Sequence, residues 1–114
     1  FGDGAQKRGF NFVSDVVDAL LAAAASDEAA GRVLNLGGRR AYSLKELSQL
    51  FGRLAGAQSV FVPFPEHRRV IDIGDYHADW TKARTLLGWR PRVGLVTGLR
   101  ETLAYFRRHG RHYR

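Results

Sequence analysis

Most apolar residues of this chain recur at the spacing of an amphipathic helix, and the segments that could form strands are few and short. The helical stripes cover residues 14–25, 44–55, 80–87 and 95–109. The candidate strands are residues 10–13, 32–36 and 60–63. We therefore expect an α/β or α+β-like fold of about four helices with a few short strands, which is too little strand for a complete doubly wound sheet.

Capping signals indicate where these helices begin and end. Ser14 is a good N-cap for the first helix, and Ser43 with Glu46 forms a capping box for the second. Gly56 is placed to end the second helix in a left-handed conformation. Asp79 can cap the third helix.

Composition places the chain among globular proteins and gives it a basic charge. Of its 114 residues, 45% are hydrophobic and 25% are charged, which suits one domain. It has no cysteine, so disulfides and thiolate chemistry are excluded. The net charge of +7 suits nucleic acid, an acidic membrane or a phosphorylated small molecule as partner, or reflects an arginine bias alone.

The chain has no apolar run of about 18 residues, so we expect no membrane association and a cytoplasmic protein. It also has no methionine, which indicates a processed chain or a fragment.

The residues taken singly offer little catalytic chemistry. The sequence has no Gly-x-Ser-x-Gly turn and no HExxH motif. His109 and His112 could share a helix face, but no carboxylate stands nearby, so we expect no metal site there. Asp72 and Asp75 could form an acid–base pair, although a turn at Gly74 makes a structural role the better interpretation. Asp75 could still accept a hydrogen bond from a hydroxyl group of a ligand.

Arg8 is placed where an anion could bind. It follows a glycine-rich segment and precedes a run with aromatic residues, so its guanidinium could present a planar fork to a phosphate or diphosphate. Arg68 and Arg69 lie in another irregular polar segment. By spacing alone, these arginines are better interpreted as solvated surface residues. Residues 2–4 are glycine-rich, but they lack the third glycine of a dinucleotide-binding fingerprint.

Five motifs stand in a fixed order along the chain. Residues 2–20 fit the pattern G-x-G-x-Q-x-R-x-F-x-x-V-x-D-V-V-x-A, residues 33–37 fit V-x-N-x-G, and residues 43–47 fit S-x-x-E-L. Residues 72–91 fit GD…D…KA…LGW-x-P, and residues 95–102 fit L-x-x-G-L-x-x-T. Together they resemble the NAD-dependent epimerases and dehydratases of nucleotide sugars, which are extended short-chain dehydrogenase/reductases.

The resemblance implies the C-terminal, substrate-binding portion of a two-part enzyme. In the family, a Rossmann domain holds NAD and a smaller portion binds the nucleotide sugar. The catalytic Y-x-x-x-K motif is absent, because Tyr42 and Lys45 are only three residues apart. We therefore expect residues 1–109 to bind a nucleotide-diphosphate sugar without catalytic, cofactor-binding or metal-binding residues of their own. Residues 14–36 would pack against the missing Rossmann domain that binds NAD, and residues 110–114 would be a mobile basic tail.

The resemblance also implies four substrate-binding residues: Arg8, Gln6, Asp75 and Arg69. The family arginine that Arg8 matches contacts the diphosphate, and the residue at the position of Asp75 lies near the phosphates or the ribose. The family commonly has a second phosphate-binding arginine three residues before that aspartate, where this chain has Asp72. Arg69 is the candidate to replace it.

Three functions stay open on the sequence alone. The first is an epimerase, with a dehydratase not distinguished from it, acting as a homodimer on an unspecified sugar and nucleotide. The second is a stand-alone basic module for nucleic acid or another polyanion, which rests on four arginines near the C-terminus: Arg107, Arg108, Arg111 and Arg114. The sequence lacks a recognised nucleic-acid motif, so we expect no nucleic-acid partner. The third is a structural domain without a ligand.

Overall fold

The structure is a computed structural model that describes residues 1–113. These residues form five α-helices: α1 (Val13–Ala24), α2 (Leu44–Ala55), α3 (Glu66–Arg69), α4 (Thr81–Leu87) and α5 (Leu95–His109). The strands β1 (Lys7–Gly9) and β2 (Ala41–Ser43) pair antiparallel, and the 3-10 turns are η1 (Asp27–Ala29) and η2 (Gly110–Tyr113). The expected α/β fragment is confirmed, and α3 is a helical turn that the sequence did not predict.

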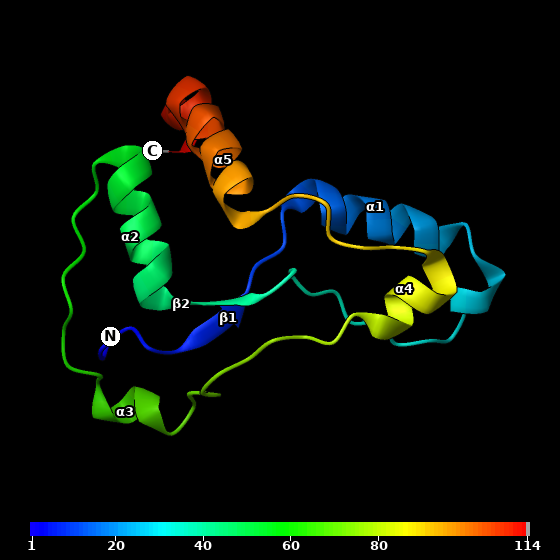
Figure 1. The fold of residues 1–114 in the computed structure, drawn as a ribbon, viewed down its shortest axis with the longest axis horizontal. Coiled ribbons are helices and arrows are strands. Elements are labelled where there is room, and N and C mark those ends of the chain that lie inside the picture. The colour runs from blue at the N-terminus through cyan, green and yellow to red at the C-terminus, as the bar shows by residue number, and fades with distance from the viewer. Residues whose placement is uncertain (114) are drawn as a thin grey trace.

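Apart from α3, the helices and strands form two groups along the long axis of the molecule (Figure 1). One group contains β1, β2, α2 and α5, and α2 packs against α5. The other group contains α1, η1 and α4, and α1 contacts both of its neighbours. Because the chain passes from β1 to α1 and then back to β2, the two groups are joined by several extended connections.

Of the four predicted caps, the two of α2 are present, and the two at the starts of α1 and α4 are displaced. In α2 the Glu46 amide donates to Ser43 Oγ at 3.0 Å, while the Ser43 amide donates to Glu46 Oε2 at 2.7 Å. Gly56 ends that helix with a φ of 67°, as predicted. The prediction for Ser14 is wrong, because the N-cap of α1 lies two residues earlier, at Phe12, which provides no side-chain bond. The N-cap of α4 is Trp80, one residue after Asp79, although Asp79 Oδ1 still accepts a hydrogen bond from the Thr81 amide at 2.8 Å.

The small core lies in the second group and is built around Trp89. Ala19 of α1 and Ala83 of α4 are buried against it, and three partly buried residues complete the cluster: Leu36, Trp80 and Leu87. The Trp89 indole donates to the carbonyl oxygen of Asp15 at 2.7 Å. Polar and apolar contacts of the same tryptophan therefore join α1 to the segment between α4 and α5.

Two glycines explain how the chain returns from η1 to β2. A Cβ at Gly37 would lie 2.4 Å from the carbonyl oxygen of Ala78, and a Cβ at Gly38 would lie 2.4 Å from that of Phe10. Only glycine permits such a close approach of two backbones. Gly37, which ends the V-x-N-x-G motif, and Gly38 after it are therefore required for packing.

The predicted strands at residues 32–36 and 60–63 are not formed. Neither segment has a neighbouring strand within residues 1–113, and a strand needs a partner for its backbone groups. Val33 is 78% exposed, whereas Leu34 and Leu36 are partly buried, so this segment is buried only in part. Leu20 and Leu21, which belong to the apolar stripe predicted on the first helix, are likewise exposed. The apolar alternation at residues 10–13 precedes and enters α1, while the strand β1 lies just before it.

Residues 110–113 form the turn η2, which lies against α5. The Tyr113 ring lies 5.1 Å from that of Phe106, and the hydroxyl groups of Tyr105 and Tyr113 are 2.7 Å apart. These aromatic contacts hold η2 against α5; Arg114 lies outside the described residues. Among residues 1–113, none of the helices combines the length and apolar character needed to cross a bilayer.

Candidate functional site

Strand β1 lies between two segments that are distant in the sequence. On one side Arg8 pairs with Tyr42 of β2 in the antiparallel register. On the other side Arg8 forms a parallel bridge with Tyr76, where the Tyr76 amide donates to Lys7 O at 3.0 Å and the Gly9 amide donates to Tyr76 O at 3.1 Å. The segment before Tyr76 is thereby held beside β1.

A tight turn before Tyr76 presents polar groups toward β1. Gly74 has a φ of 65°, a left-handed conformation that favours glycine. The carbonyl oxygen of Gly74 accepts a hydrogen bond from Arg8 Nη1. Asp75 Oδ1 accepts from the Lys7 amide at 2.8 Å, so this carboxylate also fixes the turn to the strand.

Three side chains meet at this point, those of Gln6, Arg8 and Asp72, and the Asp75 carboxylate lies next to them at the Lys7 amide. We call these four residues the Arg8 cluster. Arg8 Nη2 donates to Gln6 Oε1 at 3.4 Å and to Asp72 Oδ1 at 3.5 Å. Gln6 Nε2 donates to the other oxygen of Asp72. The side chains of Arg8 and Asp72 are 24% and 23% exposed, so a ligand can reach the pair from solvent.

The Arg8 cluster can recognise an anion, but it has no groups arranged for bond-making chemistry. Its only cation is a guanidinium, which offers a fork of N–H donors suited to phosphate. The cluster contains no serine, cysteine or lysine and no histidine base, and its two carboxylates are engaged by Arg8, Gln6 and the Lys7 amide. Within residues 1–113, no group of three or more His, Asp or Glu side chains could hold a metal ion.

The structure brings together three of the four predicted substrate-binding residues. Gln6, Arg8 and Asp75 belong to the Arg8 cluster, whereas Arg69 lies on α3 with its side chain 64% exposed. The Arg69 guanidinium pairs with Glu66 at 3.6 Å, and within residues 1–113 its side chain makes no hydrogen bond or ion pair to the Arg8 cluster. Sequence reasoning missed the contact between Arg8 and Asp72; its one signal was an acidic residue where the family commonly has arginine.

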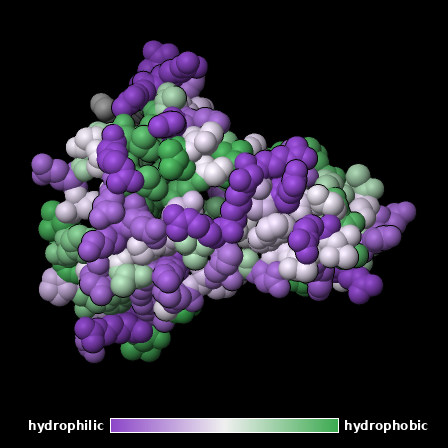
Figure 2. Space-filling view, viewed as in Figure 1, coloured by the Kyte–Doolittle hydropathy of each residue, from purple (hydrophilic) through white to green (hydrophobic). Residues whose placement is uncertain are grey.

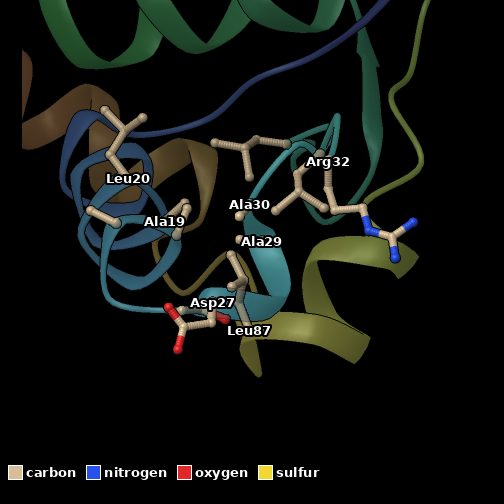
Figure 3. Close-up of a pocket in the computed structure, with 12 residues that line it drawn as sticks. Ala19, Leu20, Asp27, Ala29, Ala30, Arg32 and Leu87 are labelled. Atoms are coloured by element: carbon tan, nitrogen blue, oxygen red, sulfur yellow. The ribbon is translucent and has the colours of Figure 1, made fainter.

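A pocket of 410 Å³ lies away from the Arg8 cluster, between α1, η1 and α4. Figure 3 shows Ala19 and Leu20 on one side of it, Ala29 and Ala30 on another, and Leu87 near its base. Its lining is mostly alanine and leucine and offers few groups that could orient a polar ligand. We therefore place the candidate binding site at the Arg8 cluster.

Comparison with known proteins identifies the family. The family model described as GDP-mannose 4,6 dehydratase matches residues 1–102. The chain belongs to this family of NAD-dependent epimerases and dehydratases. Among curated members, UDP-glucuronic acid decarboxylase 1 of Danio rerio is 35% identical over 98% of the chain. UDP-glucose 4-epimerase of Mycolicibacterium smegmatis is 36% identical over 94% of the chain.

Family members with solved structures share this fold. The chain superposes on MoeE5, solved in complex with UDP-glucuronic acid and NAD, with a TM-score of 0.83 and 34% identity over 95% of the chain. The match covers 36% of MoeE5, and the chain spans 26% and 33% of the lengths of the two curated relatives. The relatives include decarboxylases, and decarboxylation is a reaction that the sequence analysis did not consider.

Proposed function

We propose that this chain is the substrate-binding portion of an NAD-dependent enzyme that converts a nucleotide sugar, and that Arg8 binds the diphosphate of that substrate. One observation carries the proposal: the pairing of β1 with Tyr76 gathers Gln6, Arg8 and Asp75 at one accessible point. A partly exposed guanidinium held in place by the backbone suits a phosphate oxygen. MoeE5, of similar fold, binds UDP-glucuronic acid.

The other members of the cluster would orient the substrate around Arg8. Asp75 Oδ1 bonds the Lys7 amide, while its second oxygen makes no hydrogen bond to residues 1–113 and can accept one from a ribose hydroxyl. Gln6 can donate to a phosphate oxygen through its amide. Arg69 would approach the diphosphate only after leaving Glu66, so its role as the second phosphate arginine stays a prediction.

Cofactor binding belongs, in this proposal, to a part of the protein outside these residues. The two-stranded antiparallel sheet of residues 1–113 includes no strand–glycine turn–helix unit, so these residues do not fit a dinucleotide. NAD would be held by a Rossmann portion that packs on residues 14–36, where Leu20, Leu21 and Val33 are exposed. The chain alone would therefore show no turnover.

Among the reactions of the relatives, we propose epimerisation. Two relatives of high similarity support this choice: the mycobacterial UDP-glucose 4-epimerase and a UDP-glucuronic acid 4-epimerase of Bacillus cereus, whose structure matches with a TM-score of 0.69 and 31% identity. Dehydration and decarboxylation are the alternatives that product analysis would distinguish. The residues of the Arg8 cluster bind substrate in all three cases.

Removing the Arg8 guanidinium in the complete protein tests the proposal. We expect Arg8→Ala to weaken the binding of UDP-glucose, dTDP-glucose or GDP-mannose, whichever binds best, by about tenfold to a hundredfold, as for the loss of a charged hydrogen bond. Titration calorimetry gives the affinity. Arg100→Ala removes an exposed arginine of α5 and is the matched control. Equal affinities in the two variants would contradict the proposal.

A further inference from the structure

The terminal N–H groups of Arg8 are directed at acceptors of the protein itself. Arg8 Nη1 donates to the carbonyl oxygens of Lys7 and Gly74, and Nη2 donates to Gln6 Oε1 and Asp72 Oδ1. A guanidinium has five N–H donors, so these contacts leave Nε–H as the donor without an acceptor in residues 1–113. A phosphate can form a two-point contact with Arg8 only if it replaces one of these acceptors.

The two terminal nitrogens of Arg8 differ in how firmly they are held. Nη1 bonds two backbone carbonyl oxygens on segments that the β-bridge fixes. Nη2 makes long contacts of 3.4 and 3.5 Å to side chains, which can rotate. The edge formed by Nε and Nη2 is therefore the edge of the guanidinium that an incoming phosphate can occupy.

Asp72 is the anionic side chain that pairs with the Nε–Nη2 edge of Arg8 in this structure. Its carboxylate contacts Arg8 Nη2 through one oxygen and accepts from Gln6 Nε2 through the other. A diphosphate bound at Nε and Nη2 would bring its negative charges close to this carboxylate, and like charges at short range repel. Movement of Asp72 away from Arg8 would also release Gln6 Nε2 as a donor for the phosphate.

We propose that Asp72 sets the affinity of the site by competing with the substrate diphosphate for the Nε–Nη2 edge of Arg8. The inference rests on the proposed function, because it needs a diphosphate at Arg8. Asp72 is then a specificity-determining residue: it lowers the affinity for any phosphate that Arg8 alone would bind. Substrates that also make contacts elsewhere in the enzyme can still displace it.

The test measures the affinity of the complete protein for UDP, dTDP and GDP by titration calorimetry. We expect Asp72→Asn to tighten the best of these by about threefold to tenfold, as for the removal of one ion pair and one repulsion. Glu101→Gln removes one negative charge from an exposed position on α5 and should leave the affinity unchanged. The gain should disappear when Asp72→Asn is combined with Arg8→Ala, because the competition acts through Arg8.

Each outcome bears on the inference. Unchanged or weaker binding by Asp72→Asn, with binding still dependent on Arg8, would overturn the inference and leave the proposed function in place. A gain that persists in the double variant would also overturn it, because the effect would then be general repulsion. If none of the three nucleotides bound to the wild type or to Asp72→Asn, the proposed function would fail and this inference with it. Tighter binding that requires Arg8 supports both.

Discussion

Asp15 is a buried carboxylate, 2% exposed, that organises the segment preceding α5. Its Oδ2 accepts hydrogen bonds from the backbone amides of Arg92 and Val93 at 3.0 and 2.9 Å. These amides lie between Pro91 and Gly94, the N-cap of α5, and are therefore outside the hydrogen bonds of the helix. The aspartate of the D-V-V motif therefore has a structural role, and it joins α1 to the start of α5.

Removing this carboxylate should destabilise the fold more than removing an exposed one from the same helix. We expect Asp15→Ala to lower the free energy of unfolding by about 2–4 kcal/mol, because two amides near the core lose their acceptor. Urea denaturation followed by the fluorescence of Trp80 and Trp89 measures the change. Asp18→Ala, at an exposed position of α1, should cost less than about 0.5 kcal/mol. Similar losses in the two variants would show that Asp15 is not structural.

The distance in sequence between contacting residues explains which parts of the site could be predicted from the sequence. Gln6, Arg8 and Asp75 were found because motifs shared with a family carry them. The pairing of Arg8 with Asp72 joins positions 64 residues apart, and no local pattern reports such a contact. Arg69 was the candidate to replace the missing arginine; the helical turn of α3 directs its guanidinium to Glu66, and its role at the site stays a prediction.

At the scale of elements, the four longer helices were predictable, whereas α3 and the strands were not. The capping box fixes the start of α2 through contacts within four residues, and Gly56 fixes its end. The strand β1 instead depends on residues 41–43 and on Tyr76, which only the folded chain brings near. The apolar segment 32–36 has the composition of a strand, but its pairing requires a neighbour that residues 1–113 do not provide.

The capping box of α2 makes stability depend on pH in a predictable direction. The hydrogen bond from the Ser43 amide lowers the pKa of Glu46 below its ordinary value of about 4.3, and Arg40 adds to the effect. Because the pKa is lowered in the folded state, the ionised carboxylate stabilises the fold fully at pH values above its ordinary pKa. This contribution is lost as the pH falls through the folded-state pKa.

We therefore expect Glu46→Gln to flatten the acid side of the stability profile. Between about pH 5 and pH 3 the melting temperature of the variant should fall less than that of the wild type, because the glutamine has no proton to gain. Thermal melts at a series of pH values, monitored by circular dichroism, measure the difference. Glu101→Gln, at an exposed position of α5, should follow the wild-type profile. Parallel wild-type and Glu46→Gln profiles would contradict the prediction.

At the scale of the whole molecule, the chain is more extended than its length requires. Its radius of gyration is 16.7 Å, against about 13 Å for a compact domain of this size. Apolar side chains reach the surface over α1 and between α2 and α5 (Figure 2). The buried core is correspondingly small and contains only one large side chain, Trp89, among residues 1–113. Such a surface fits the proposal that residues 14–36 pack against another part of the same protein.

Hydrogen exchange in the complete protein can test that packing directly. Within residues 1–113, the amides of residues 33–36 donate to no acceptor, although their apolar composition is that of a buried strand. If a Rossmann portion covers this segment, its amides should exchange on the order of a thousandfold more slowly than in an unfolded chain. Residues 57–60 are also exposed and outside any helix or strand, but they lie outside the proposed interface and should exchange rapidly. Equally fast exchange in the two segments would show that residues 32–36 remain uncovered and would remove the structural basis for the proposed two-part enzyme.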